Sequence, residues 1–218
     1  MDLQAVIFDM DGLLIDSEPF WQAAGVALLK QYGHSLTLPQ YESSTGLRTR
    51  EWLELWFNHF YIPLSEIPAA ENAIIDAVID KIKTQGKLMS GVHHIINYFL
   101  KKELKLGIAT SSPMKMADVV VDMFNLRPVL SAITSAGTLP YGKPHPQVYI
   151  NCAEELGVKP SQCLAFEDSF NGMLAAKSAK MKCVVVPAMH QSNDPRWGAA
   201  DLKISSLQNF NDLLLRNM

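Results

Sequence analysis

Residues 3–12 read Leu-Gln-Ala-Val-Ile-Phe-Asp-Met-Asp-Gly, a mostly apolar run that stops at two carboxylates and a glycine. A short run of this kind, rich in β-branched residues, is typical of a buried strand. Similar runs lie at 104–110, 163–166 and 183–187, with a shorter one at 131–135. Amphipathic helical patterns separate these runs. Strands that alternate with helices predict βαβ units around a parallel sheet.

The stretch 19–87 has a different pattern, with no convincing strand run, and it predicts several helices. Apolar residues recur at three- and four-residue steps in its middle: Trp52, Leu55, Trp56 and Phe60. We interpret this stripe as packing rather than as a platform for a sugar ring. A further amphipathic helix is expected over 71–85, and Pro63 and Pro68 are expected to break the pattern between the two.

An all-helical block therefore interrupts an α/β pattern after its first strand. We expect a Rossmann-like parallel-sheet core built from residues 1–15 and 88–218, and a helical cap of residues 16–87 inserted into it. The two chain crossings, near 14–17 and 86–90, are the expected hinges. A cap on hinges can close over a site, exclude water, and open to release product.

Composition excludes several classes of protein. The chain has 218 residues, of which 48% are hydrophobic and 19% charged, which is ordinary for a globular protein. Lys and Arg total 19 against 22 Asp and Glu, so the net charge is −3. This balance offers no basic excess for nucleic acid or anionic lipid, and we expect neither as a partner.

The same composition bears on location and assembly. No apolar run approaches the ~18 residues that a membrane span needs. Residues 1–4 carry an acid and no basic segment, so no signal peptide is predicted. The three cysteines lack metal-ligand spacing, and free thiols suit a reducing compartment. We expect a cytoplasmic protein, and a monomer because no exposed apolar repeat requires a partner.

Polar side chains follow several of the predicted strands. In open α/β sheets, ligands bind outside the carboxyl ends of the strands, where the strand order reverses. Each group alone has an ordinary explanation as a turn, a helix cap or a solvated charge. Together, the acidic groups suit Mg²⁺, and the hydroxyls and lysine suit a phosphate. The residues are Asp9, Asp11, Thr110, Ser111, Ser112, Lys143, Glu167 and Asp168.

These motifs, in this order, resemble the haloacid dehalogenase-like phosphohydrolase superfamily. The string from 9 to 18 is similar to the branch that contains β-phosphoglucomutase and small sugar-phosphate phosphatases, and the helical insertion is similar to the cap of that branch. The segments 139–146 and 193–196 further resemble bacterial 2-deoxyglucose-6-phosphate or hexitol-phosphate phosphatases. The resemblance covers essentially the whole chain.

The resemblance implies a role for each carboxylate. Asp9 would be the nucleophile that forms an aspartyl-phosphate. Asp11 would be the general acid that protonates the leaving oxygen, and then the base that activates water. Mg²⁺ would be held by Asp9, the backbone carbonyl of Asp11, and Asp168. Glu167 would support the site from behind these ligands or bind the cation through a water.

The resemblance also implies how the phosphate is held. Thr110, with Ser111 and Ser112 beside it, would bind the non-bridging oxygens, and Lys143 would neutralise charge on both the phosphate and the nucleophile.

In the cap, the resemblance points to Glu18 and the loop 46–50 as substrate-facing. Arg48 or Arg50 could contact sugar hydroxyls or a distal anion, and the alternative for each arginine is simple solvation. Arg48 is the candidate that we name as substrate-binding.

The function predicted is a Mg²⁺-dependent phosphatase of small sugar or sugar-alcohol phosphates. The main alternative is a phosphomutase like β-phosphoglucomutase, which carries a His where Trp21 stands here; this departure favours hydrolysis. A dehalogenase does not require the carboxylate of Asp11. A non-catalytic sugar-phosphate binding module is a third possibility, but such a module would be expected to lack a motif residue, and none is missing.

Overall fold

The computed structural model describes residues 2–218 and contains a six-stranded parallel sheet. The strand order is β3-β2-β1-β4-β5-β6, so the order reverses on either side of β1. This arrangement confirms the predicted Rossmann-like core. The strands are β1 (Ala5–Phe8), β2 (Lys105–Thr110), β3 (Ala132–Ser135), β4 (Cys163–Glu167), β5 (Lys182–Val185) and β6 (Leu202–Lys203).

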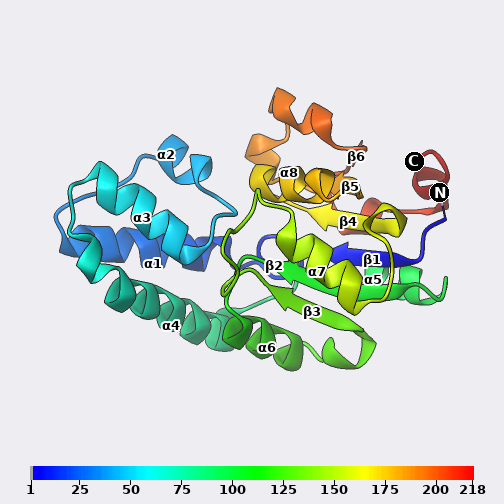
Figure 1. Ribbon diagram of the computed structural model, residues 1–218, viewed down its shortest axis with the longest axis horizontal. Helices are drawn as coiled ribbons and strands as arrows, with labels where there is room; N and C mark the ends of the chain where they lie inside the picture. Colours follow the sequence, from blue (N-terminus) through cyan, green and yellow to red (C-terminus); the bar gives the residue numbers. More distant parts are fainter. Residues whose placement is uncertain (1) are drawn as a thin grey trace.

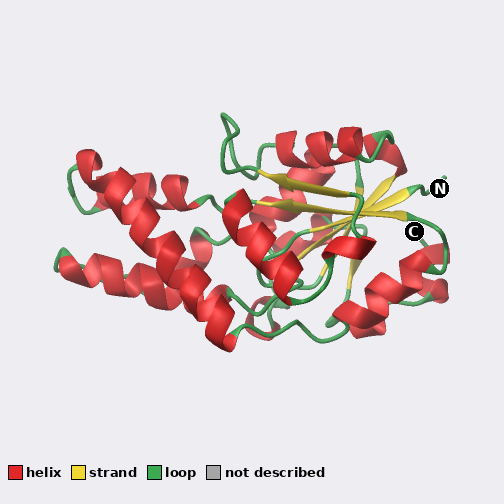
Figure 2. Cartoon of the chain, turned by 90° about the horizontal axis from the view of Figure 1, so that it is seen from below, coloured by secondary structure: helices red, strands yellow, loops and turns green. Residues whose placement is uncertain are grey.

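Helices cover both faces of the sheet, as Figure 2 shows with the sheet seen nearly edge-on. They are α5 (Val92–Leu100), α6 (Met114–Met123), α7 (Gln147–Glu155), α8 (Phe170–Ser178) and the short α9 (Asp212–Arg216). Successive residues of β1 point to opposite layers. Val6 and Phe8 pack with α5 and α6, whereas Ala5 and Ile7 pack with α7 and α8. Burial on both faces explains why the strand sequence is continuously apolar.

The inserted segment between β1 and α5 is all-helical, as predicted, and extends from one end of the sheet (Figure 1). It contains α1 (Glu18–Gln31), α2 (Leu38–Ser43), α3 (Thr49–His59) and α4 (Ile67–Gln85). α4 begins four residues before the predicted start at 71, because Pro68 lies in its first turn, where a missing amide hydrogen has no cost.

The aromatic stripe of the insertion has two environments. Trp56 is buried, as a packing residue should be, but Trp52 is only partly buried and Leu55 is exposed. The five apolar residues expected to form the buried face of α4 are all buried: Ile74, Ile75, Val78, Ile79 and Ile82.

The two chain crossings lie side by side. Ile15 and Leu88 form an isolated antiparallel bridge. The amide of Asp16 donates to the carbonyl of Lys87 at 2.9 Å, and the amide of Met89 donates to that of Leu14 at 2.9 Å. The insertion therefore leaves and rejoins the sheet core at one point. Within residues 2–218, none of the helices combines the length and apolar character needed to cross a bilayer.

Candidate active site

The site lies at the carboxyl end of β1, where the strand order reverses. Asp9 follows β1 directly, and its amide donates to the carbonyl of Phe166 in β4 at 2.9 Å. Gly12 turns the chain with a φ of +74°, and a Cβ there would lie 2.1 Å from Oδ2 of Asp168. Only glycine fits a left-handed turn this close to a carboxylate. The turn therefore lets the first and fourth strand ends present their acids together.

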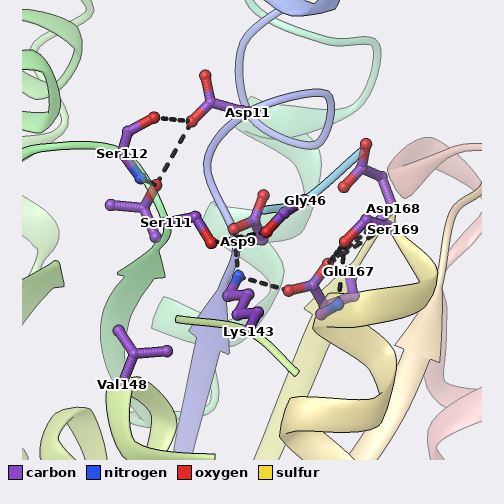
Figure 3. A network of polar contacts seen from close by, with 12 residues as sticks. Asp9, Asp11, Gly46, Ser111, Ser112, Lys143, Val148, Glu167, Asp168 and Ser169 are labelled. Atoms are coloured by element: carbon purple, nitrogen blue, oxygen red, sulfur yellow. Dashed lines mark hydrogen bonds and ion pairs between the residues drawn. The ribbon is translucent and has the colours of Figure 1, made fainter. Parts of the chain in front are cut away.

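Lys143 lies between two of these acids. Its Nζ donates to Oδ1 of Asp9 and to Oε1 of Glu167, the latter at 2.6 Å, and its side chain is 1% exposed (Figure 3). Burial alone would lower the pKa of Lys143, but Asp9 and Glu167 outweigh burial and hold this pKa above its ordinary value. Lys143 is therefore a fixed ammonium aimed at Asp9.

Glu167 is saturated by hydrogen bonds from the protein. Its Oε1 accepts from Lys143 and from the hydroxyl of Tyr149 at 2.6 Å. Its Oε2 accepts from the amides of Asp168 at 3.2 Å and Ser169 at 3.3 Å, and from the Ser169 hydroxyl at 3.1 Å. A carboxylate engaged in this way orients Lys143 from behind the pocket.

Asp9, Glu167 and Asp168 form an acidic cluster in which one carboxylate oxygen of each residue lies within 4.8 Å of those of the other two. Burial, followed by repulsion from the neighbouring carboxylates, raises the pKa of Asp168, and burial likewise raises that of Asp9 against the opposing effect of Lys143. Within residues 2–218, no hydrogen bond reaches the Asp168 carboxylate. When all three carboxylates are ionised, the single ammonium leaves two negative charges uncompensated, which together with burial accounts for the raised pKa values. An oxygen-rich set with this charge fits a divalent hard cation such as Mg²⁺.

The Asp11 side chain points away from Asp9 in Figure 3. Its Oδ1 accepts from the hydroxyl of Ser17 at 2.7 Å and from Nε1 of Trp21 at 2.8 Å. Its Oδ2 accepts from the hydroxyl of Ser112 at 2.7 Å and more weakly from that of Thr110 at 3.4 Å. The carboxylate is thus fixed where β2, the first crossing and the start of α1 meet.

A pocket opens above these residues, between the sheet and the insertion. The core contributes the polar end, and the insertion contributes aromatic and aliphatic walls together with the hydroxyl residues Ser44, Thr45 and Thr49. The walls from the insertion include Trp21, Tyr41, Leu47, Trp52 and Ile74, with Glu18 among them. Burial, reinforced by Asp11 and Asp16, raises the pKa of Glu18 to about 7. Among residues 2–218, the only basic side chain that lines this pocket is Lys143.

The structure gathers most of the residues singled out in the sequence. Lining the pocket are Asp9, Asp11, Glu18, Ser111, Ser112, Lys143 and Asp168. Thr110 and Glu167 are fully buried beneath it. Arg48 is not brought to this pocket, because its guanidinium donates to the backbone carbonyls of Ala136, Leu139 and Pro140 and to Glu51.

Several contributors escaped sequence reasoning, and they include Ser17, Ser169 and two tyrosines. Tyr149 lies at a core position of the helical pattern at 148–156, and nothing in that pattern distinguishes its hydroxyl. Tyr41 belongs to the short helix α2, which has no buried residue and hence no apolar periodicity to reveal it.

The fold and the acidic cluster at its strand ends are those of a hydrolase, and relatives named as phosphatases show that its class acts on phosphoric monoesters. More particularly, residues 6–186 match the family model of the haloacid dehalogenase-like hydrolases, and the chain belongs to that family. Both the family and the enzyme class were predicted from the ordered motifs at 9–12, Thr110, Lys143 and 167–168, and both predictions are confirmed.

Curated relatives and solved structures agree with this assignment. The chain is 41% identical over 204 residues to hexitol phosphatase B of Escherichia coli K12, covering 93% of this chain and 92% of that protein. It is 30% identical over 195 residues to a phosphorylated carbohydrates phosphatase of Thermotoga maritima, covering 88% of each. The structure of β-phosphoglucomutase from Clostridium difficile superposes with a TM-score of 0.85 over 98% of this chain and 96% of that one, at 21% identity, which shows a shared fold.

Proposed function

We propose that this enzyme hydrolyses phosphate monoesters of small sugars or sugar alcohols, hexitol phosphates among them, with Mg²⁺ and through an aspartyl-phosphate. The observation that carries the proposal is the pocket itself, in which Lys143 and the acidic cluster face aromatic, aliphatic and hydroxyl side chains, with no second basic group in the lining among residues 2–218. The names of the two phosphatase relatives support the sugar-phosphate class. The sequence-based expectation of a cytoplasmic monomer remains part of the proposal.

Asp9 is the proposed nucleophile. Lys143 binds Oδ1 of Asp9, which leaves the other oxygen to attack phosphorus in line with the leaving alkoxide. Asp9, Asp168 and the backbone carbonyl of Asp11 would hold Mg²⁺, which when bound offsets the repulsion between carboxylate and phosphate. Lys143 neutralises charge on the phosphoryl oxygens, and the hydroxyl of Ser111 would bind one of them after turning from the carbonyl of Gly46. The hydroxyls of Thr110 and Ser112 donate to Asp11, so they hold the proposed acid rather than the phosphate.

Asp11 is the proposed acid and base. It protonates the alkoxide as the bond to phosphorus breaks, then takes a proton from the water that attacks the aspartyl-phosphate, which releases phosphate and restores Asp9. The hydroxyls of Ser17 and Ser112 can donate to a carboxylate or accept from a carboxylic acid, so they can hold Asp11 in both forms. Trp21 can only donate, and it fixes the orientation of the ionised form.

The charge of the pocket favours hydrolysis over mutase chemistry. A phosphomutase that works through a sugar bisphosphate must hold a second phosphate at the far end of its substrate, where a basic side chain is the natural partner. Arg48 and Arg50 are the nearby candidates, but Arg48 is bound to loop carbonyls and Arg50 pairs with Glu71. Glu18, near Asp11 and Asp168, adds a further acidic group to the pocket and can accept hydrogen bonds from sugar hydroxyls.

We further propose that residues 16–87 act as a cap that closes over the core of residues 1–15 and 88–218. The bridge between Ile15 and Leu88 ties the two hinges together, so the cap would move as one body. Closure excludes bulk water from the polar end of the pocket and brings Glu18 over the substrate.

A phosphate-release assay tests the proposal. The wild type should release phosphate from hexitol phosphates with Mg²⁺ and lose this activity with EDTA. Asp9→Asn should abolish turnover, whereas Asp122→Asn, an exposed carboxylate far from the site, should retain it. A fully active Asp9→Asn variant would overturn the mechanism. Isomerised sugar from a hexose 1-phosphate with a bisphosphate primer, in place of free phosphate, would establish the mutase instead.

A further inference from the structure

Arg48 and Glu51 join the insertion to the loop that carries Lys143. Arg48 immediately precedes α3, and its Nη1 donates to the carbonyls of Ala136, at 3.1 Å, and Leu139. Its Nη2 donates to the carbonyl of Pro140 at 3.3 Å and to Oε1 of Glu51 at 2.7 Å. These carbonyls belong to the loop of residues 136–142 between β3 and α7. We refer to Arg48, Glu51 and this loop as the clasp.

Glu51 completes the clasp next to the catalytic lysine. Its Oε1 accepts from the amide of Gly142 at 2.9 Å, one residue before Lys143. A Cβ on Gly142 would lie 2.5 Å from Oε2 of Glu51 and 2.7 Å from Nε of Arg48. Only a residue without a side chain allows so close an approach. The insertion therefore touches the backbone that directly positions Lys143.

Forming the clasp costs free energy, which argues against an incidental surface contact. The Arg48 side chain is 12% exposed, and its Nε is buried without a hydrogen-bond partner within residues 2–218. Leaving a buried donor unsatisfied costs about 1–3 kcal/mol. By contrast, Arg50 is 53% exposed and pairs with Glu71 entirely within the insertion. The two arginines lie two residues apart, yet only Arg48 reaches the core.

Lys143 is sensitive to where this loop lies. Its Nζ must stay between Asp9 and Glu167, and no other basic side chain among residues 2–218 lines the pocket. Displacing a reacting group by about 1 Å can cost about 100-fold in rate, even when the mutated residue is remote. A loop that is held only while the insertion contacts it would place Lys143 correctly only in the closed enzyme.

We propose that Arg48 and Glu51 are positioning residues that fix Lys143 when the cap closes, so that enclosure of the substrate and completion of the catalytic centre occur together. This inference rests on the proposed function. In the open enzyme the carbonyls of the 136–142 loop would return to water, and the loop would relax. The enzyme would then be arranged for catalysis only around a substrate that the cap has enclosed.

The test compares Arg48→Met with Arg50→Met, which removes an equivalent charge from the same segment. We expect Arg48→Met to lower kcat on a hexitol phosphate by about 100-fold with little change in KM, and Arg50→Met to change kcat by less than about threefold, as expected for an exposed pair. Amide hydrogen exchange should accelerate over residues 136–142 in Arg48→Met alone. Arg48→Lys keeps the charge and the stem but loses the planar fork, so it should fall between wild type and Arg48→Met.

The possible outcomes distinguish a failure of the proposal about Arg48 and Glu51 from a failure of the proposed function. Equal kcat values for Arg48→Met and Arg50→Met, or unchanged hydrogen exchange over 136–142, would overturn the proposal that Arg48 positions Lys143. Either result would leave the proposed phosphatase function intact. A rise in KM with kcat unchanged would also overturn the proposal about Arg48, because that pattern marks a loss of substrate binding rather than of positioning. If the wild type released no phosphate from any ester, the proposed function would fail, and the exchange measurement would still decide whether Arg48 holds the loop. Should Arg48→Met not fold, Arg48→Lys and Glu51→Gln carry the same comparison.

Discussion

Removing one hydroxyl, in Tyr149→Phe, should destabilise the protein far more than the same change at Tyr98. Both hydroxyls donate to a carboxylate over 2.6 Å, Tyr149 to Glu167 and Tyr98 to Asp212. Tyr149 and Glu167 are fully buried, whereas the Asp212 side chain is 58% exposed. The two substitutions therefore remove chemically identical hydrogen bonds from opposite environments.

The magnitude follows from burial. A hydrogen bond to a charged group contributes about 1.5–3 kcal/mol when its partner cannot turn to water. At about 2–4 °C per kcal/mol for a chain of this size, the Tm of Tyr149→Phe should fall by about 3–12 °C. Water can replace the hydroxyl at Asp212, so Tyr98→Phe should cost less than about 1 kcal/mol. The aromatic ring beneath Lys143, 5.0 Å from its Nζ, is retained in Tyr149→Phe.

Thermal unfolding followed by circular dichroism, at neutral pH with EDTA, measures both variants under one condition. Burial, and then the charge of Glu167, raises the pKa of Tyr149, so this residue stays a donor across the usable pH range. Equal falls in Tm for the two variants would refute the reasoning, because burial would then not set the strength of this hydrogen bond. A loss of kcat in Tyr149→Phe would additionally show that Glu167 needs both donors to orient Lys143.

Three further predictions concern the cation, pH and the insertion. Adding Mg²⁺ at 100 times its Kd should raise the free energy of unfolding of the wild type by about 2.7 kcal/mol. Asp168→Asn should lose most of that gain in stability. An equal gain in both proteins would place the cation elsewhere. Burial, then Asp11 and Asp16, raises the pKa of Glu18 from its ordinary 4.5 to about 7, so its protonated form stabilises the fold below pH 4.5 and this contribution is lost as pH rises through 7. The Tm of Glu18→Gln relative to wild type should thus be higher at pH 8.5 than at pH 5, and a pH-independent difference would contradict the assigned environment. Gly46 has a φ of +84°, and a Cβ there would lie 2.7 Å from Oγ of Ser169. Gly46→Ala should therefore lower kcat/KM at least tenfold, because the added methyl group would hold the insertion off the core. Gly33 also has a positive φ but faces open space, so the control Gly33→Ala should leave kcat/KM unchanged.

The parts of the fold that sequence predicts are those with a periodic apolar signal. β1 is buried on both faces, and its sequence is continuously apolar as a consequence. The two residues of β6 are too few to carry a pattern, and β6 was not predicted. The start of α4 was predicted too late because Pro68 was interpreted as a break, although proline is favoured in a first helical turn.

The residues of the site likewise divide into those that the sequence reveals and those that it does not. Asp9, Lys143 and Asp168 stand at strand ends or in loops, where a polar residue after an apolar run is visible in the sequence. The partners of Arg48 were not visible, because they are backbone carbonyls of a loop 88–92 residues further along the chain. Backbone groups have no sequence identity, so only the docking of the insertion onto that loop reveals them. The four donors around Asp11 likewise depend on how the first crossing and the start of α1 pack against the end of β2.

The pairing of Ile15 with Leu88 also bears on how such a chain can diversify. A segment whose two ends leave the sheet within one hydrogen-bonded step can be lengthened, shortened or exchanged as a cassette without moving any strand. Asp9, Lys143 and Asp168 all lie outside that segment, while Trp21, Tyr41 and Trp52 lie within it. Exchange of the segment would therefore change the walls of the pocket and leave the strand ends in place, provided that the replacement keeps the contacts that Ser17 and Trp21 make with Asp11 and that Arg48 makes with the 136–142 loop.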